Sequence, residues 1–284
     1  MSRNIRTAVQ SATDLLKKAG VEDARRDAAL LLASILAKDS GFLHREPDYL
    51  LSEDEDDAFD TAVGRRVKRE PVSHILGRRE FWSLEFAVGP EVLDPRPDSE
   101  TLIAAALAAC EENVNPRKIL DLGTGSGCLL LSLLSELPKA QGLGIDASEA
   151  ALRVAAENAA MLQLDTRARF RTGNWCAGLQ ESFDLVISNP PYIADKDVDT
   201  LAPEVREYEP RLALAGGADG LDCYRIILSE LFAVLEPGGL AVFELGIGQA
   251  ERVSHLMTAA GLQNIARHRD LAGIERCLSG WRGI

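Results

Sequence analysis

The sequence predicts an α/β protein, in which helices cover both faces of a mostly parallel β-sheet, with a small all-helical module before it. Two observations support this prediction. From Asp98 onward, strand-like and helix-like patterns alternate along the chain, which is typical of a parallel sheet. Before about residue 72, apolar residues recur only at helical spacing. We therefore expect a helical domain over residues 1–72, a connector over 73–97 and an α/β domain over 98–284.

The N-terminal module shows three helical patterns. The first ends at Gly20, and the second begins near Asp23, a candidate N-cap. The third begins at Ser52 with Glu55 three residues later, which is the signature of a capping box. This pattern continues to about residue 69, and Pro71 ends it.

The remaining elements follow in order along the chain. Residues 75–96 show a short alternating apolar pattern and several prolines, which favours a hairpin or an extended connector. We expect helices at 99–112, from the glycine loop to about 137, at 148–162 and at 221–235, and strands at 118–122, 143–145, 168–171, 183–188 and 240–245.

Composition limits the possible functions. The formal net charge of −13 disfavours direct binding to a nucleic-acid backbone, which needs a basic face. No run approaches the roughly 18 apolar residues of a membrane span, and no signal core follows the first residues, so we expect a cytoplasmic protein. The five cysteines and four histidines are scattered without metal-ligand spacing, so no metal is expected.

One basic run stands out in this acidic chain. Residues 65–69 read Arg-Arg-Val-Lys-Arg, and Arg78 and Arg79 follow. The run is either a solvated helix end, favoured beside the helix dipole, or a contact surface for an acidic or ribosomal partner.

A glycine-rich loop directly follows the strand at 118–122, with the sequence Gly123-Thr124-Gly125-Ser126-Gly127. Glycines let the backbone approach a ligand closely, and the next helix offers free N–H groups. The dinucleotide fingerprint would place its third glycine at position 128, which is Cys128. The observed spacing instead resembles the first motif of class I methyltransferases, although a structural turn alone would also use these glycines.

Two further sites suit the recognition of an adenosine. Asp146 ends the next strand, beside the glycine loop, where a carboxylate can accept both ribose hydroxyls. Asn174 and Trp175 follow the third strand, where they can bond the adenine amino group and pack on the ring. The alternatives are that Asp146 caps the next helix, a position that Ser148 already suits, and that Trp175 belongs to the core.

The fourth strand ends in Asn189-Pro190-Pro191-Tyr192, which we call the clamp tetrapeptide. In an open α/β sheet this strand end faces the same crevice as the glycine loop. The Asn189 oxygen and the Pro190 carbonyl can each accept one hydrogen of a planar NH₂ group, and Tyr192 can press on its face. Two acceptors draw charge onto the nitrogen and aim its lone pair at a methyl donor, so no strong general base is required.

This tetrapeptide occurs in adenine amino-methyltransferases and in glutamine amide methyltransferases, so it cannot decide between them. Residues elsewhere distinguish the two classes. Over essentially its whole length the chain resembles the bacterial release-factor glutamine methyltransferase family. Besides the glycine loop and the clamp tetrapeptide, the matching segments are GRREFW at 77–82, PRPDSE at 95–100, EVREYEPR at 204–211 and DLAGIER at 270–276.

The resemblance implies a Rossmann-like class I methyltransferase fold with a seven-stranded, mostly parallel sheet, and an N-terminal domain that helps to dock the substrate. It implies methyl transfer from S-adenosylmethionine, with S-adenosylhomocysteine as product, to the glutamine of the Gly-Gly-Gln tripeptide in class-1 peptide-chain release factors. The residues implied for the cofactor are Gly123, Thr124, Gly125, Ser126, Gly127, Asp146, Trp175 and Asn189. Those implied for the glutamine are Asn189, Pro190, Pro191 and Tyr192, with Asn189, Pro190 and Tyr192 as the catalytic set.

The chain departs from the family pattern at three positions. Asp94 stands where an apolar residue is usual, and His74 where tyrosine is common. Asn174 replaces a frequent aspartate, which bears on the adenine contact.

Three alternative functions stay open at this point. A sister enzyme that methylates a ribosomal-protein glutamine shares the clamp tetrapeptide, but its connector usually reads Arg-Ser-Pro where this chain has Arg96-Pro97-Asp98. A nucleic-acid adenine methyltransferase is disfavoured by the net charge of −13. A non-catalytic binding module would require a broken cofactor site, whereas the glycine loop and Asp146 are intact.

Overall fold

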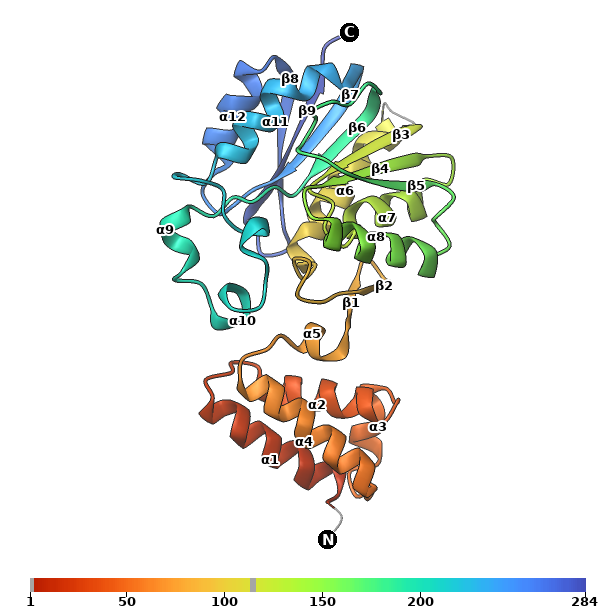
Figure 1. The fold of residues 1–284 in the computed structure, drawn as a ribbon, viewed down its shortest axis with the longest axis vertical. Coiled ribbons are helices and arrows are strands. Elements are labelled where there is room, and N and C mark those ends of the chain that lie inside the picture. The colour runs from red at the N-terminus through yellow and green to blue at the C-terminus, as the bar shows by residue number, and fades with distance from the viewer. Residues whose placement is uncertain (1–2, 113–115) are drawn as a thin grey trace. The chain divides into compact units, whose positions relative to one another are not determined.

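A computed structural model describes residues 3–112 and 116–284 of the chain, which form two compact units (Figure 1). The helical unit contains the chain up to Arg78 and also the segment Ala202–Tyr208. The second unit, which we call the sheet unit, contains Arg79–Leu201 and Glu209–Ile284. The segment Ala202–Tyr208 follows the clamp tetrapeptide in the sequence, and its place among the N-terminal helices was not predicted.

The predicted helices of the N-terminal module are present, and two short helices were missed. The capping box is confirmed, because Ser52 Oγ accepts from the Glu55 amide at 3.2 Å and the Glu55 carboxylate accepts from the Ser52 amide at 2.8 Å. Asp23 occupies the N-cap position of α2, as predicted, but its side chain makes no capping hydrogen bond. The helices are α1 (Ile5–Lys18), α2 (Ala24–Ile35), α3 (Ser40–Arg45), α4 (Glu53–Val67), α5 (Val72–Leu76) and α10 (Pro203–Arg206).

The helical unit has its own apolar core. Leu16 of α1, Leu31 and Leu32 of α2, and Phe59 of α4 are completely buried within it. Burying each such side chain contributes about 1.5–3 kcal/mol, so packing rather than helix propensity holds the unit together.

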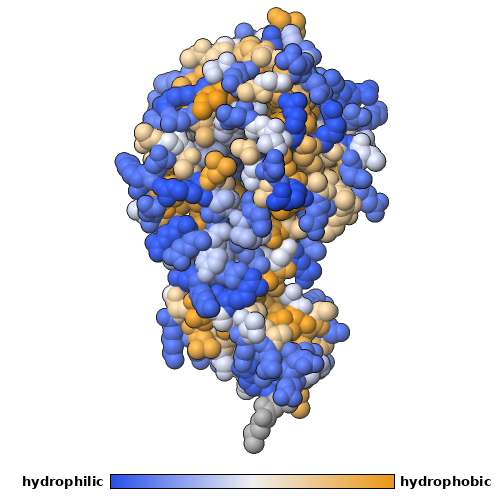
Figure 2. All heavy atoms as spheres, in the orientation of Figure 1, coloured by the Kyte–Doolittle hydropathy of each residue, from blue (hydrophilic) through white to orange (hydrophobic). Residues whose placement is uncertain are grey.

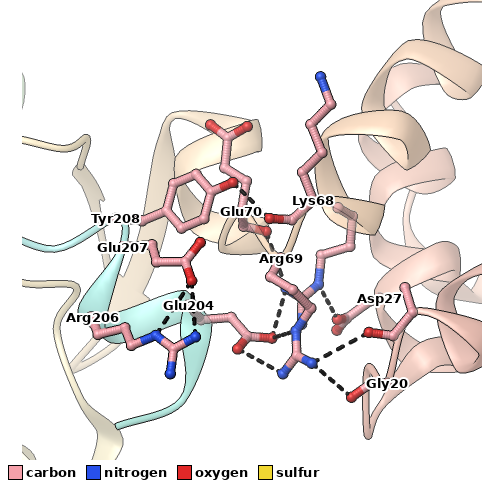
Figure 3. A network of polar contacts seen from close by, with 11 residues as sticks. Gly20, Asp27, Lys68, Arg69, Glu70, Glu204, Arg206, Glu207 and Tyr208 are labelled. Atoms are coloured by element: carbon pink, nitrogen blue, oxygen red, sulfur yellow. Dashed lines mark hydrogen bonds and ion pairs between the residues drawn. The ribbon is translucent and has the colours of Figure 1, made fainter. Parts of the chain in front are cut away.

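Charged side chains attach the segment 202–208 to these helices (Figure 3). Arg69 reaches both carboxylate oxygens of Glu204, with Nε at 2.6 Å and Nη2 at 2.8 Å. Arg66 contacts the same carboxylate at 3.0 Å and Asp27 of α2 at 2.8 Å. The Tyr208 hydroxyl donates to the Lys68 carbonyl at 2.7 Å. Since Arg65 also pairs with Glu70, the three arginines of the basic run have acidic partners inside the unit.

The sheet unit is built on seven strands in the order β5-β4-β3-β6-β7-β9-β8 among the described residues. β5, β4, β3, β6 and β7 run parallel, whereas β9 is antiparallel to both of its neighbours. This confirms the predicted seven-stranded, mostly parallel sheet. Its strands are β3 (Lys118–Leu122), β4 (Gln141–Asp146), β5 (Ala168–Thr172), β6 (Phe183–Ser188), β7 (Leu235–Glu244), β8 (Leu262–Arg269) and β9 (Glu275–Arg282).

Helices cover both faces of this sheet, as predicted. One apolar core lies between the sheet and α6 (Glu100–Glu112), α7 (Cys128–Glu136) and α8 (Glu149–Met161), and the other lies beneath α11 (Asp222–Glu230) and α12 (Ala250–Ala259). The predicted hairpin is present as β1 (Arg78–Phe81) and β2 (Leu84–Ala87), and a short helix, α9 (Asp195–Val198), follows the clamp tetrapeptide. The elements α12, β8 and β9 were not individually predicted.

Strand register brings the expected functional loops to one edge of the sheet. Leu122, at the end of β3, pairs with Ile145 of β4 on one side and with Ser188 of β6 on the other. The loops that follow these strands therefore leave the sheet side by side (Figure 1).

In the described residues, no helix combines the length and apolarity needed to cross a bilayer. On the face shown in Figure 2, hydrophobic residues occur in separate groups among hydrophilic ones.

Candidate active site

A cavity of about 310 Å³ lies at the carboxyl edge of the parallel strands, entirely within the sheet unit. Its size suits a small ligand such as a nucleoside derivative. The loops after β3, β4, β5 and β6 all contribute to its lining. Of the residues selected from the sequence, those that line it are Gly123, Thr124, Gly125, Ser126, Asp146, Asn174, Trp175, Asn189 and Pro191.

The glycine loop needs glycine for its backbone shape. Gly125 has a φ of +53° and Gly127 a φ of +80°, a region that side chains disfavour. A Cβ on Gly127 would also lie 3.3 Å from the Cβ of Ala155 in α8. Gly127 is not among the lining residues, and it instead forms the N-cap position of α7.

Asp146 connects two of the loops that line the cavity. Its Oδ2 accepts from the Gly125 amide at 2.9 Å, and its Oδ1 accepts from the Ser148 amide at 2.9 Å. Ser148 itself caps α8, because its hydroxyl accepts from the Ala151 amide at 3.2 Å. The carboxylate thus fixes the glycine loop and faces the cavity at the same time.

A second carboxyl, Asp121, lies buried behind the glycine loop. Its Oδ2 accepts from the Thr124 hydroxyl at 2.6 Å, whereas its Oδ1 is buried without a hydrogen-bond partner among the described residues. Burial raises the pKa of Asp121 to about 7, and the nearby charge of Asp146 adds to this shift. A buried carboxyl next to the glycine loop, outside the cavity lining, therefore has a charge that depends on pH near neutrality.

Trp175 belongs both to the cavity wall and to the surroundings of the apolar core. Its ring forms part of the cavity lining and also packs against the apolar core beneath α11. A Cβ on Gly123 would lie in ordinary van der Waals contact with that ring, at 3.5 Å, so it is the φ of +72° that favours glycine at this position.

The clamp tetrapeptide divides between the cavity and the protein interior. Asn189 and Pro191 line the cavity, whereas Pro190 is buried and Tyr192 is half-buried, and neither is among the lining residues. Asn189 Nδ2 donates to the Ser99 hydroxyl at 3.5 Å, which leaves the side-chain oxygen of Asn189 to accept from a ligand. The Tyr192 hydroxyl donates to Oε1 of Glu244 at 3.3 Å, and burial raises the pKa of this tyrosine above its ordinary value.

Sequence reasoning missed part of the cavity wall. The segment that precedes α6 contributes Arg96 and Ser99, and residues 210–213 contribute Leu212 among others. The first segment lies within the motif at 95–100 and the second begins within the motif at 204–211, but the spacing of these motifs gave no sign that they meet. Glu244 was also missed, although a carboxylate at the end of an apolar strand was a usable signal.

Comparisons with known proteins identify relatives of both units of the chain. Residues 7–77 match the family described as PrmC N-terminal domain, and residues 99–206 match the family described as Methyltransferase small domain. The release factor glutamine methyltransferase of Rhodospirillum rubrum is 48% identical over 263 residues, which cover 93% of this chain and 80% of that protein. The release factor glutamine methyltransferase of Caulobacter vibrioides is 44% identical over 281 residues, which cover 99% and 97%.

The fold itself also has a solved counterpart. The hMettl16 catalytic domain, crystallised with the MAT2A 3'UTR hairpin 6, aligns with a TM-score of 0.57 over 78% of this chain and 82% of that chain. The sequence identity is 14%, so this likeness concerns the fold alone. Together with the Methyltransferase small domain match, it confirms the class I methyltransferase fold.

Proposed function

The chain belongs to the release factor glutamine methyltransferase family, and from this premise we propose that it transfers the methyl group of S-adenosylmethionine to the Gly-Gly-Gln glutamine of class-1 peptide-chain release factors. One observation carries the proposal. Residues 123–126 of the glycine loop, Asp146 and Asn189 line a single cavity. Within the described structure the side-chain nitrogen of Asn189 donates to Ser99, and its side-chain oxygen stays available to accept a hydrogen bond from a ligand.

The residues present fit the cofactor. Asp146 would hold the ribose hydroxyls, Asn174 and Trp175 the adenine, and the backbone of residues 123–127 the methionine part. Gly125 lines the cavity, and a Cβ there would meet nothing within 4 Å, so glycine leaves this part of the loop open to a ligand. When bound, S-adenosylmethionine supplies an electrophilic methyl group.

The clamp tetrapeptide would then prepare the glutamine nitrogen. An amide nitrogen is a weak nucleophile because its lone pair is delocalised into the carbonyl. Hydrogen bonds from its two hydrogens to the Asn189 oxygen and to the Pro190 carbonyl would draw electron density onto nitrogen and fix the direction of attack. Ser99 supports this arrangement, since it receives the Asn189 Nδ2 donor and so orients the oxygen toward the cavity. We further propose that the helical unit docks the release factor.

A direct methyl-transfer assay tests the proposal. Purified protein is incubated with labelled S-adenosylmethionine and with a release factor, a large-subunit ribosomal protein or DNA in parallel. We expect peptide mass spectrometry to find the methyl group on the Gly-Gly-Gln glutamine, and we expect Asn189→Ala to form this product about 10²- to 10³-fold more slowly. Label on the ribosomal protein alone would favour the sister enzyme, and label on DNA alone would mean that the clamp tetrapeptide holds an adenine.

A further inference from the structure

Glu244 lies next to the clamp tetrapeptide and has no part in the proposed function described above. It is the last residue of β7, the strand beside β6. Since Phe243 pairs with Ser188, Glu244 lies beside Asn189 at the sheet edge. Its side chain is 1% exposed and is not among the residues that line the cavity.

The carboxyl of Glu244 is only partly satisfied in this interior position. Oε1 accepts from the Tyr192 hydroxyl at 3.3 Å, whereas Oε2 has no hydrogen-bond partner among the described residues. A buried polar atom without a hydrogen-bond partner destabilises the fold, so the presence of a carboxyl at this position calls for a functional explanation. The main-chain carbonyl of Glu244 accepts from the Tyr224 hydroxyl at 2.6 Å, which fixes the strand end.

The groups around Glu244 connect it to both ends of the clamp tetrapeptide. Burial raises its pKa to about 7, while the Ser99 hydroxyl, Arg276 and Tyr192 favour the charged form and Asp98 opposes it. Ser99 also receives the Nδ2 donor of Asn189 at 3.5 Å. One carboxyl therefore neighbours the hydroxyl that orients Asn189 and accepts from the hydroxyl of Tyr192.

We propose that Glu244 is a positioning residue that holds the clamp tetrapeptide at both ends, through the Tyr192 hydroxyl and through Ser99. This inference rests on the proposed function, because it concerns how the same site presents Asn189. Glu244 does not touch the substrate in this scheme. Its effect is to restrict the orientations of Asn189 and Tyr192, so it should act on turnover rather than on binding.

The test compares Glu244→Ala and Glu244→Gln with the parent enzyme and with a matched control. Glu230→Gln serves as the control, because Glu230 also has a buried carboxyl oxygen without a partner and lies outside the cavity at the end of α11. The measurements are kcat and KM for the release factor, the Kd for S-adenosylmethionine, and the melting temperature of each variant.

We expect Glu244→Ala to lower kcat by about 10- to 100-fold, with KM and Kd changed by less than about 3-fold. Glu244→Gln keeps an oxygen for the Tyr192 hydroxyl, so it should recover most of the rate. In a Ser99→Ala/Tyr192→Phe background, Glu244→Ala should lower kcat no further, because both connections are already gone. Glu230→Gln should leave kcat unchanged.

Two results would overturn the inference. One is a parent-like kcat in a folded Glu244→Ala variant, and the other is an equal loss with and without Ser99 and Tyr192. If the alanine variant does not fold, the isosteric glutamine variant in the same two backgrounds decides between these outcomes. If the enzyme methylates a substrate other than release factors, the proposed function fails, yet the same series on that substrate still decides the role of Glu244.

Discussion

Arg96 and Glu209 form an ion pair in which one guanidinium nitrogen, Nη2, contacts both oxygens of a buried carboxylate at 2.6 and 2.8 Å. The Glu209 side chain is almost fully buried, whereas Arg96 is one-third exposed. Arg96 itself lines the cavity, and Pro210, next to Glu209, lines it as well. The pair therefore joins two cavity walls that are far apart in the sequence.

Breaking this pair should weaken cofactor binding in a pH-dependent way. Burial raises the pKa of Glu209 to about 7, and Arg96 opposes this shift. In Arg96→Met the Glu209 carboxylate loses the positive charge that stabilises it. As the pH rises through 7, burying this unpaired carboxylate destabilises the cavity wall that the ion pair holds together. We expect calorimetry to show a Kd for S-adenosylmethionine raised by about 10-fold at pH 8 and by less at pH 6. Arg211→Met, which breaks an exposed pair with Asp199, is the control, and an equal effect of both variants would contradict the prediction.

Asp146→Ala should lower cofactor affinity by about 10- to 100-fold, the usual loss for hydrogen bonds to a charged group. The variant also releases the Gly125 amide that Asp146 holds. Asp184→Ala is a matched control, because Asp184 likewise accepts from two backbone amides, at the amino end of β3 rather than beside the cavity. Equilibrium binding of S-adenosylmethionine to both variants is the measurement. A loss shared by Asp184→Ala would mean that the effect is one of stability.

Asn189→Ala should lower the single-turnover rate of release-factor methylation by about 10²- to 10³-fold, by analogy with the loss of one preorganised hydrogen-bonding group at a reacting centre. Ser99→Ala keeps the Asn189 oxygen but removes the hydroxyl that orients it, so its loss should be smaller, about 10-fold. An Asn189→Ala rate within 3-fold of the parent would remove Asn189 from the reaction.

Arg66→Met should destabilise the helical unit by about 3 kcal/mol, because it removes the buried guanidinium that pairs with both Asp27 and Glu204. Arg65→Met removes a more exposed pair with Glu70 and should cost about 0–1 kcal/mol. Hydrogen exchange can localise the effect, and we expect reduced protection in α2, α4 and residues 202–208 of the Arg66 variant. Unchanged protection in the segment 202–208 would show that the contact between Arg66 and Glu204 does not hold it.

Glu244→Gln should gain stability relative to the parent as the pH rises. The pKa of Glu244 is raised from 4.5 to about 7, so its contribution to stability is fully present below pH 4.5 and is lost as the pH rises through 7. The glutamine side chain does not titrate in this range. The raised pKa values of Asp121 and Glu209 are present in both proteins, so they do not affect the difference. We expect the difference in the free energy of unfolding to move by roughly 3 kcal/mol in favour of the variant between pH 4.5 and 8. Glu251→Gln, on an exposed part of α12, controls for the loss of one charge, and a pH-independent difference would contradict the prediction.

Local chemistry explains which elements could be predicted. The capping box of Ser52 and Glu55 and the strand Lys118–Leu122 depend on neighbouring residues, and both are present as predicted. The short helices α3 and α5 were missed because six and five residues carry too little periodicity. The strands β8 and β9 were missed because exposed residues interrupt one and buried residues fill the other without alternation.

The sequence by itself determined the class of fold, the glycine loop and the clamp tetrapeptide, because each depends on residue types at short, fixed spacing. Only the tertiary structure decided which distant residues share one site. Glu244 meets Tyr192 because β7 lies beside β6, and Arg96 meets Glu209 because two loops converge on the same cavity. Likewise, Glu204 meets Arg69 because the segment 202–208 packs on the helical unit. These contacts depend on the order of the strands and on how the connections between them run. Both are set by the burial of apolar surface over the whole fold, and neither produces a periodic pattern in the sequence.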